Sequence, residues 1–168
     1  MKKLLLSVIS IAMVIVTLAP TALAVNEQIP EWQNSLMTEE EFNAILANNT
    51  IHTADENTRA TGLISAYAIA ISKSGTNTLN IAGMTTGTYD VVKSGFKEVV
   101  IQRRANSSSD WSDYIVYKDI YVDMGSCNLG RSVTVTTGYQ YRVTCVHYAK
   151  KNFFSVQKID NVSNIIQF

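Results

Sequence analysis

The sequence predicts an all-β sandwich of about seven short strands, preceded by a short acidic helix. Residues 63–72 alternate large side chains with alanines, and residues 139–147 alternate apolar with polar side chains. Alternation with a period of two is typical of strands that bury one face. Gly, Ser and Asn residues separate these segments at short intervals, as turn residues do in sandwiches and barrels.

The chain begins with a segment typical of an export signal. Lys2 and Lys3 form a positive start, residues 4–18 are mostly apolar, and Ala22 and Ala24 supply the small residues of a peptidase site. The apolar run is shorter than the roughly 20 residues that a spanning helix needs, which favours cleavage over a retained anchor. We therefore expect a signal peptide at residues 1–24. The mature chain is expected to be secreted and extracellular, with at most a loose association with the cell envelope.

Residues 25–60 are predicted to form an acidic arm that contains one helix. Seven acidic residues and one arginine give this region a net charge of −6, whereas residues 61–168 carry a net charge of +4. The arm is either a solvated leader or a segment that docks on the basic body. Thr38 and Glu41 form a capping-box signature, and the apolar stripe that follows predicts a helix over residues 38–48.

The β-sandwich domain is expected at residues 61–168. After the strand at 63–72, the same patterns predict strands at residues 76–84, 96–104, 114–123, 131–137, 139–147 and 155–168.

Three parts of this domain carry a resemblance to known sandwiches. Residues 96–104, Trp111 and residues 139–150 resemble fibronectin type III and related immunoglobulin-like domains. The resemblance implies that Tyr139 is the corner tyrosine, whose hydroxyl binds backbone upstream. The same segments resemble a family of short exported proteins of Gram-positive bacteria whose function is unknown. This likeness implies a fold and a compartment, and no active site.

The cysteines and histidines give no metal signature. Cys127 and Cys145 are either a disulfide, which suits an exported chain, or two small core residues. His52 and His147 lie far apart, and neither belongs to a ligand-spaced cluster. We expect no metal and no cofactor, and the charge of the body is too small to indicate nucleic acid as a partner.

One binding surface is predicted on the strand at 114–123. By alternation, Tyr117, Asp119 and Tyr121 share a face, and Trp111 is close in sequence. If this face is exposed, its aromatic rings and carboxylate suit sugar rings or a partner protein. Tyrosines that serve no ligand are also common on exposed sheet faces.

A second surface is predicted in the last hairpin loop. Its candidate residues are Lys150, Lys151, Phe153 and Phe154. Loops of sandwiches often carry recognition, so these side chains could contact an anionic wall, a membrane interface or a partner protein. Alternatively, one phenylalanine covers the end of the core while the lysines stay in water.

An enzyme is not expected, since the sequence has two histidines and no Gly-x-Ser-x-Gly nucleophile motif. We expect a secreted, non-enzymatic interaction or structural module whose partner is an extracellular protein or glycan. Membrane contact is expected only through the signal peptide, before its cleavage. The alternatives are a carbohydrate-binding module that uses exposed aromatics and a small secreted hydrolase.

Overall fold

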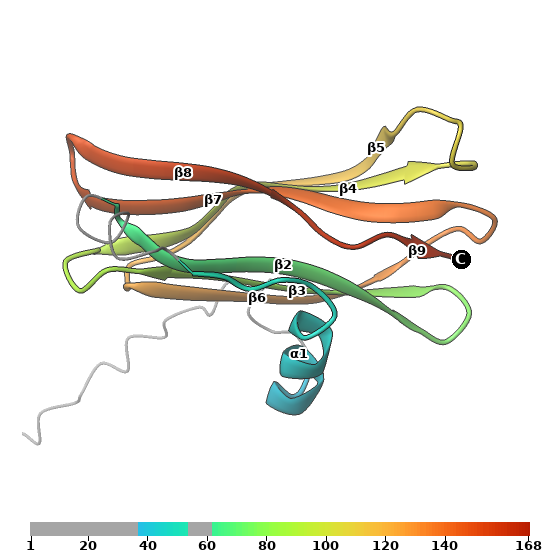
Figure 1. Cartoon of the computed structure of the whole chain (residues 1–168), viewed down its shortest axis with the longest axis horizontal. Helices are drawn as coiled ribbons and strands as arrows, with labels where there is room; N and C mark the ends of the chain where they lie inside the picture. Colours follow the sequence, from blue (N-terminus) through green and yellow to red (C-terminus); the bar gives the residue numbers. More distant parts are fainter. Residues whose placement is uncertain (1–36, 54–61) are drawn as a thin grey trace, which may run out of the picture.

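The computed structural model describes residues 37–53 and 62–168, which form two antiparallel sheets packed face to face and one short helix (Figure 1). Sheet A has the strand order β1-β2-β3-β6, and sheet B has the order β5-β4-β7-β8 with β9 beside β7. The predicted β-sandwich is confirmed. The strands of sheet A are β1 His52–Thr53, β2 Ile64–Ser74, β3 Thr78–Gly87 and β6 Ser126–Thr134. Those of sheet B are β4 Lys93–Arg104, β5 Ser112–Val122, β7 Gln140–Asn152, β8 Ser155–Val162 and β9 Ile166–Gln167.

The expected strands correspond to β2 through β9, with β8 and β9 dividing the segment 155–168. The bounds 131–137 are wrong for β6, which begins at Ser126 and ends at Thr134. The two-residue strand β1 has no counterpart in the prediction, because two residues are too short to show a period. The expected signal peptide at 1–24 and the arm residues 25–36 lie outside the described residues, as do residues 54–61.

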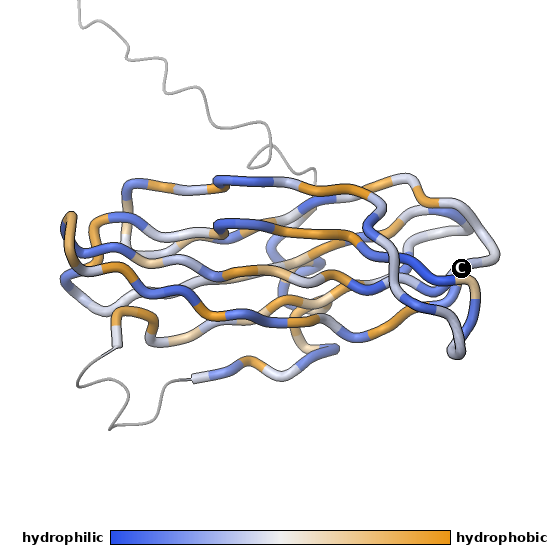
Figure 2. The backbone as a smooth tube through the Cα atoms, turned by 90° about the horizontal axis from the view of Figure 1, so that it is seen from above, coloured by the Kyte–Doolittle hydropathy of each residue, from blue (hydrophilic) through white to orange (hydrophobic). Residues whose placement is uncertain are grey.

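Alternation along the strands builds the core between the sheets, and hydrophilic and hydrophobic residues follow one another along most of the chain (Figure 2). Strand β7 shows this most clearly, since every second residue from Tyr141 to Ala149 is buried. Of these, Tyr141, Val143 and Cys145 belong to the main cluster between the sheets, which also contains Ile69, Ile81 and Phe96. Burial of this apolar surface is the main force that holds the two sheets together.

Tyr141, and not Tyr139, makes the hydrogen bond to upstream backbone, so the expectation for Tyr139 is wrong. The Tyr141 hydroxyl accepts from the Thr136 N–H at 3.1 Å and donates to the Thr136 carbonyl at 2.8 Å. Its ring is fully buried in the main core. Tyr139 lies just before β7, where its ring packs at the edge of the core beneath the Arg103 guanidinium, 4.8 Å away.

Strand β5 does not alternate regularly, and the predicted stripe on it is wrong. Asp119 has a positive φ of 56°, which shifts the side-chain direction of every residue after it by one position. Tyr117 consequently packs against the core, whereas Val116 and Lys118 are exposed on the outer face. Ile120 is buried as expected. Tyr117 and Tyr121 therefore lie on opposite faces of the sheet.

The predicted helix is α1, Glu39–Leu46, and its capping box is confirmed. The Glu41 N–H donates to the Thr38 Oγ1 at 3.2 Å, and the Thr38 N–H donates to the Glu41 carboxylate at 2.9 Å. The helix packs on the outer face of sheet A, where Ile45 and Leu46 lie over Ala68, Ala70 and Ala82. Small side chains on the sheet let the helix approach closely, which gives this short helix the docking surface it needs.

Both cysteines are buried free thiols, so the structure contains no disulfide between them. Cys127 lies on β6 of sheet A and Cys145 on β7 of sheet B, and both belong to the main core. The sequence left open a disulfide or two small core residues, and in the structure both cysteines are small core residues.

Candidate functional site

Three connections far apart in sequence meet at one end of the sandwich, which we call the loop end. They are residues 88–92 between β3 and β4, 123–125 between β5 and β6, and 153–154 between β7 and β8 (Figure 1, left). Hydrogen bonds join them: Val92 N–H donates to the Lys150 carbonyl at 2.9 Å, and the Ser94 hydroxyl donates to the Met124 carbonyl at 2.8 Å. The loops therefore form one surface rather than three independent segments.

Large apolar side chains of the loop end project into solvent. Tyr89 is 101% exposed, Phe154 92% and Phe153 81%, and Val92 and Met124 are also exposed. The predicted hairpin-loop residues are thus on the surface, and neither phenylalanine covers the core. The tip is a two-residue turn in which the Asn152 side chain accepts from the Phe154 N–H at 3.0 Å. The two rings contact each other edge to face, 5.2 Å apart.

The charged groups at the loop end are paired across the loops. Lys93 forms an ion pair with Asp123 at 2.9 Å, and Lys151 forms one with Asp90. The hydrogen bond from Lys151, followed by the one from Thr88, lowers the pKa of Asp90. Within the described chain, Lys150 forms no ion pair. Both aspartates are therefore neutralised, and the loop end carries an excess of positive charge.

A pair of tyrosines lies directly behind the loop end on sheet B. Tyr121 of β5 and Tyr148 of β7 are both opposite Gly95 of β4, and their rings meet across it at 4.6 Å. Burial, followed by the bond to Asp119, raises the pKa of Tyr121 well above its usual range. Asp119 accepts from the Tyr121 hydroxyl at 3.0 Å and from Lys97. The structure thus brings Asp119 and Tyr121 toward Lys150, Lys151, Phe153 and Phe154, a proximity that the sequence did not show.

Trp111 lies at the opposite end of β5, away from these residues. The Arg104 and Arg142 guanidiniums each lie 4.4 Å from its ring, and neither forms an ion pair with the described residues. Burial and the charge of Arg104 lower the pKa of Arg142. Tyr117 is inside, beneath Arg131 at 4.3 Å. Trp111, Tyr117 and Tyr121 therefore form no common aromatic platform.

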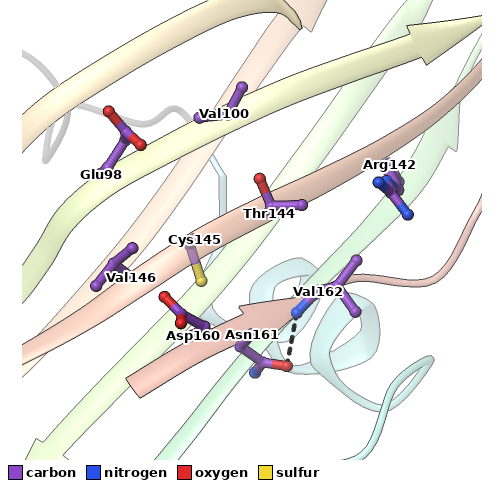
Figure 3. A pocket seen from close by; sticks show the side chains of 9 residues that line it. All are labelled: Glu98, Val100, Arg142, Thr144, Cys145, Val146, Asp160, Asn161 and Val162. Carbon is purple, nitrogen blue, oxygen red and sulfur yellow. Dashed lines mark hydrogen bonds between the residues drawn. The ribbon is translucent and has the colours of Figure 1, made fainter. Parts of the chain in front are cut away.

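A shallow hollow of about 580 Å³ adjoins Arg142 on the outer face of sheet B (Figure 3). Val100, Val146 and Val162 give it an apolar floor, and Arg142 and Asp160 supply opposite charges along its border. Val116, Val100, Thr144 and Val162 stand in one cross-strand row of β5, β4, β7 and β8. This row is not visible in the sequence, because only the register between strands brings these residues together.

Cys145, one of the residues that line the hollow, belongs to a buried polar cluster around His147. Thr85 Oγ1 lies 2.7 Å from the His147 Nδ1 and donates to the Gly95 carbonyl at 3.0 Å, so it accepts from a protonated Nδ1. The unprotonated Nε2 then faces the Cys145 thiol at 3.3 Å and the Asn161 amide at 3.5 Å. The neutral imidazole therefore satisfies each partner.

Burial in this cluster keeps both the His147 imidazole and the Cys145 thiol in their neutral forms. Burial lowers the pKa of His147 to about 3, with a smaller contribution from His52. Burial, followed by the charge of Asp160, raises the pKa of Cys145, and burial raises that of Cys127 to about 12. A cysteine nucleophile must be a thiolate in reach of substrate, and Cys145 is a buried thiol. The cluster is built for packing rather than for nucleophilic attack.

Residues 37–53 and 62–168 contain no group of three or more His, Cys, Asp or Glu side chains that could hold a metal ion. In the same residues, no helix is both long and apolar enough to cross a bilayer.

Comparisons with known proteins give no family. No family model matches the chain, and no curated protein matches it. Among solved structures, the chain is similar to the GAE domain of GGA2p from Saccharomyces cerevisiae at 9% identity and a TM-score of 0.31. That match covers 68% of this chain and 94% of the other.

Proposed function

We propose that this protein is an exported, non-enzymatic interaction module that acts outside the cell or at its surface and contacts its partner through the loop end. One observation carries the proposal: Tyr89, Phe153 and Phe154 project from two loops at nearly full exposure. Leaving such side chains in water is unfavourable, and apolar surface gathered in one place marks an interaction site. Export is supported by the signal-peptide pattern of residues 1–24.

The proposed fold type is that of fibronectin III and immunoglobulin-like domains. If β2 is counted as strand A, then β2-β3-β6 correspond to A-B-E and β4-β7-β8 to C-F-G. The fourth strand, β5, joins β4 rather than β6, which differs from the immunoglobulin constant type. The Tyr141 hydroxyl, bonded to Thr136 five residues upstream, supports the same assignment. In such sandwiches the loops at one end are a common place for recognition.

The absence of enzymatic activity is part of the proposal. Among the described residues, the Cys145 thiol lies 3.3 Å from the His147 Nε2, and both side chains are buried in their neutral forms. This arrangement supports a binding role over the small hydrolase.

Site-specific photo-cross-linking tests the proposal. p-Benzoyl-phenylalanine is placed at position 154, and at position 106 in the loop at the other end as the matched control. Both proteins are exposed to light on the surface of producing cells. We expect adducts from position 154 and few from position 106. Equal yields from the two positions, or none from position 154, would contradict a partner at the loop end.

A second candidate is glycan binding on the outer face of sheet B. The hollow beside Arg142 favours it, because an apolar floor bordered by Arg142, Thr144 and Asp160 offers a sugar both a flat contact and hydrogen-bond partners. Trp111 would contribute the aromatic surface. Glycan-array binding that is lost in Trp111→Ala and kept in Phe154→Ser would support this candidate over the loop end.

A further inference from the structure

We propose that the loop end docks on a bilayer that contains anionic phospholipid, inserting Tyr89, Phe153 and Phe154 into its interfacial layer. The inference rests on the proposed function, since it names the partner of that same surface. Of the contacts that the sequence left open for the hairpin loop, it selects the membrane interface.

The shape of the loop end favours a fluid partner. Its aromatic side chains project outward at the tips of separate loops, and Phe154 and Tyr89 have almost no covering atoms. A folded protein partner would need a preformed cavity for each projection. A bilayer interface accommodates protruding rings without such cavities, and Tyr and other aromatic side chains are favoured at the headgroup level.

The charge of the loop end is complementary to an anionic surface. Lys93, Lys150 and Lys151 lie on the strand residues next to the loops, and Asp90 and Asp123 are each held by a lysine. A lysine carries a long apolar stem, so it can lie along inserted aromatic rings while its ammonium group reaches phosphate oxygens. Exposed aromatic rings with lysines behind them are the composition of interfacial anchors.

The tyrosine pair behind the loops gives the docked domain a defined depth. Tyr148 is four residues from Asn152 along β7, which places it about 13 Å from the hairpin tip. Its neighbour Tyr121 lies beneath the Lys93 ammonium at 5.9 Å. With the hairpin tip inserted and the strands running along the membrane normal, the tyrosine pair would contact the outer headgroups.

The test measures sedimentation of the exported protein with vesicles, after its N-terminus has been determined by mass spectrometry. One set of vesicles contains phosphatidylglycerol with phosphatidylcholine, and the other contains phosphatidylcholine alone. We expect tighter binding to the first set and weaker binding at high salt. The double variant F153S/F154S should weaken partitioning by at least about 100-fold, because it removes two exposed rings that would be buried in the interface. Ile165→Ser, which alters an exposed apolar residue outside the loop end, should leave binding unchanged.

A second readout covers the case in which the double variant folds poorly. In Phe154→Trp the indole replaces an exposed ring, and its emission should shift to the blue on vesicles that contain phosphatidylglycerol. Absence of binding, equal binding to the two vesicle sets, or equal binding by F153S/F154S would each overturn the inference. If vesicles are not bound but position 154 cross-links to a protein, the bilayer inference fails and the proposed function stands. If neither occurs, both fail.

Discussion

At the residue scale, the Tyr141 hydroxyl fixes the connection between β6 and β7, because it bonds both backbone groups of Thr136. Tyr141→Phe removes these two hydrogen bonds and leaves the Thr136 groups without that partner. We expect a loss of about 1–3 kcal/mol in the free energy of unfolding, measured with urea. Tyr139→Phe is the matched control, since the described chain offers its hydroxyl no hydrogen bond, and it should change stability by less than about 0.5 kcal/mol. Equal losses in the two variants would contradict the assignment of the corner to Tyr141.

Also at the residue scale, the lowered pKa of His147 predicts how the stability of the fold depends on pH. Its pKa is about 3 in the folded protein against an ordinary value of 6.5, so the unfolded chain binds the proton more tightly. The stability that the neutral His147 side chain contributes is fully present above about pH 6.5 and is lost as the pH falls toward 3. Between about pH 7 and pH 5 we expect a loss on the order of 2 kcal/mol.

Urea unfolding across that range measures this loss, with His147→Gln as the control. The variant is expected to be less stable overall but to lose most of the pH slope. Asp90 and Asp119 do not interfere, because their pKa values are lowered from 3.8 and their contributions disappear only at more acidic pH. An unchanged slope in the variant would show that another group is responsible.

At the scale of one element, β4 depends on Gly95. Its φ of +149° is unfavourable for other residues, and an added Cβ would lie 2.0 Å from the Ile120 carbonyl oxygen. Gly95→Ala should therefore cost at least about 3 kcal/mol in unfolding free energy, because the clash is with backbone and not with a flexible side chain. Gly75→Ala also sits at positive φ, +66°, but with no atom within 4 Å. It should cost only about 1–2 kcal/mol, and a similar loss at both glycines would contradict the argument.

The elements also show how far sequence patterns reach. The capping box at Thr38 and the alternation of β7 are local signals, and the structure confirms both. The face of Tyr117 was not predictable, because the period of two is interrupted by the positive φ of Asp119, which the sequence does not mark. The corner tyrosine was misplaced by two residues, since Tyr139 and Tyr141 have the same parity and alternation cannot separate them.

At the scale of the whole molecule, the candidate site arises from topology. Tyr89, Met124 and Phe153 are far apart in sequence, and the strand topology brings their loops to one end. The loops of Tyr89 and Met124 cross between the sheets, whereas that of Phe153 is a hairpin of sheet B. The sequence showed that the hairpin loop is aromatic and basic, but no local pattern could show which other loops join it. The same end also carries the Tyr121–Tyr148 pair, which depends on the register of three strands.

Across the described residues, some apolar side chains are buried and stabilise the fold, whereas others are exposed and available to a partner. Phe96 is fully buried between the sheets, whereas Phe153 and Phe154 are among the most exposed large hydrophobic residues of the described chain. Phe96→Ala should cost about 3–5 kcal/mol in unfolding free energy, because it leaves a cavity in the core. F153S/F154S should change that free energy by less than about 0.5 kcal/mol while shortening retention on a hydrophobic-interaction column. A large loss of stability in the double variant would mean that the two rings support the core. Their exposure would then no longer indicate an interaction site.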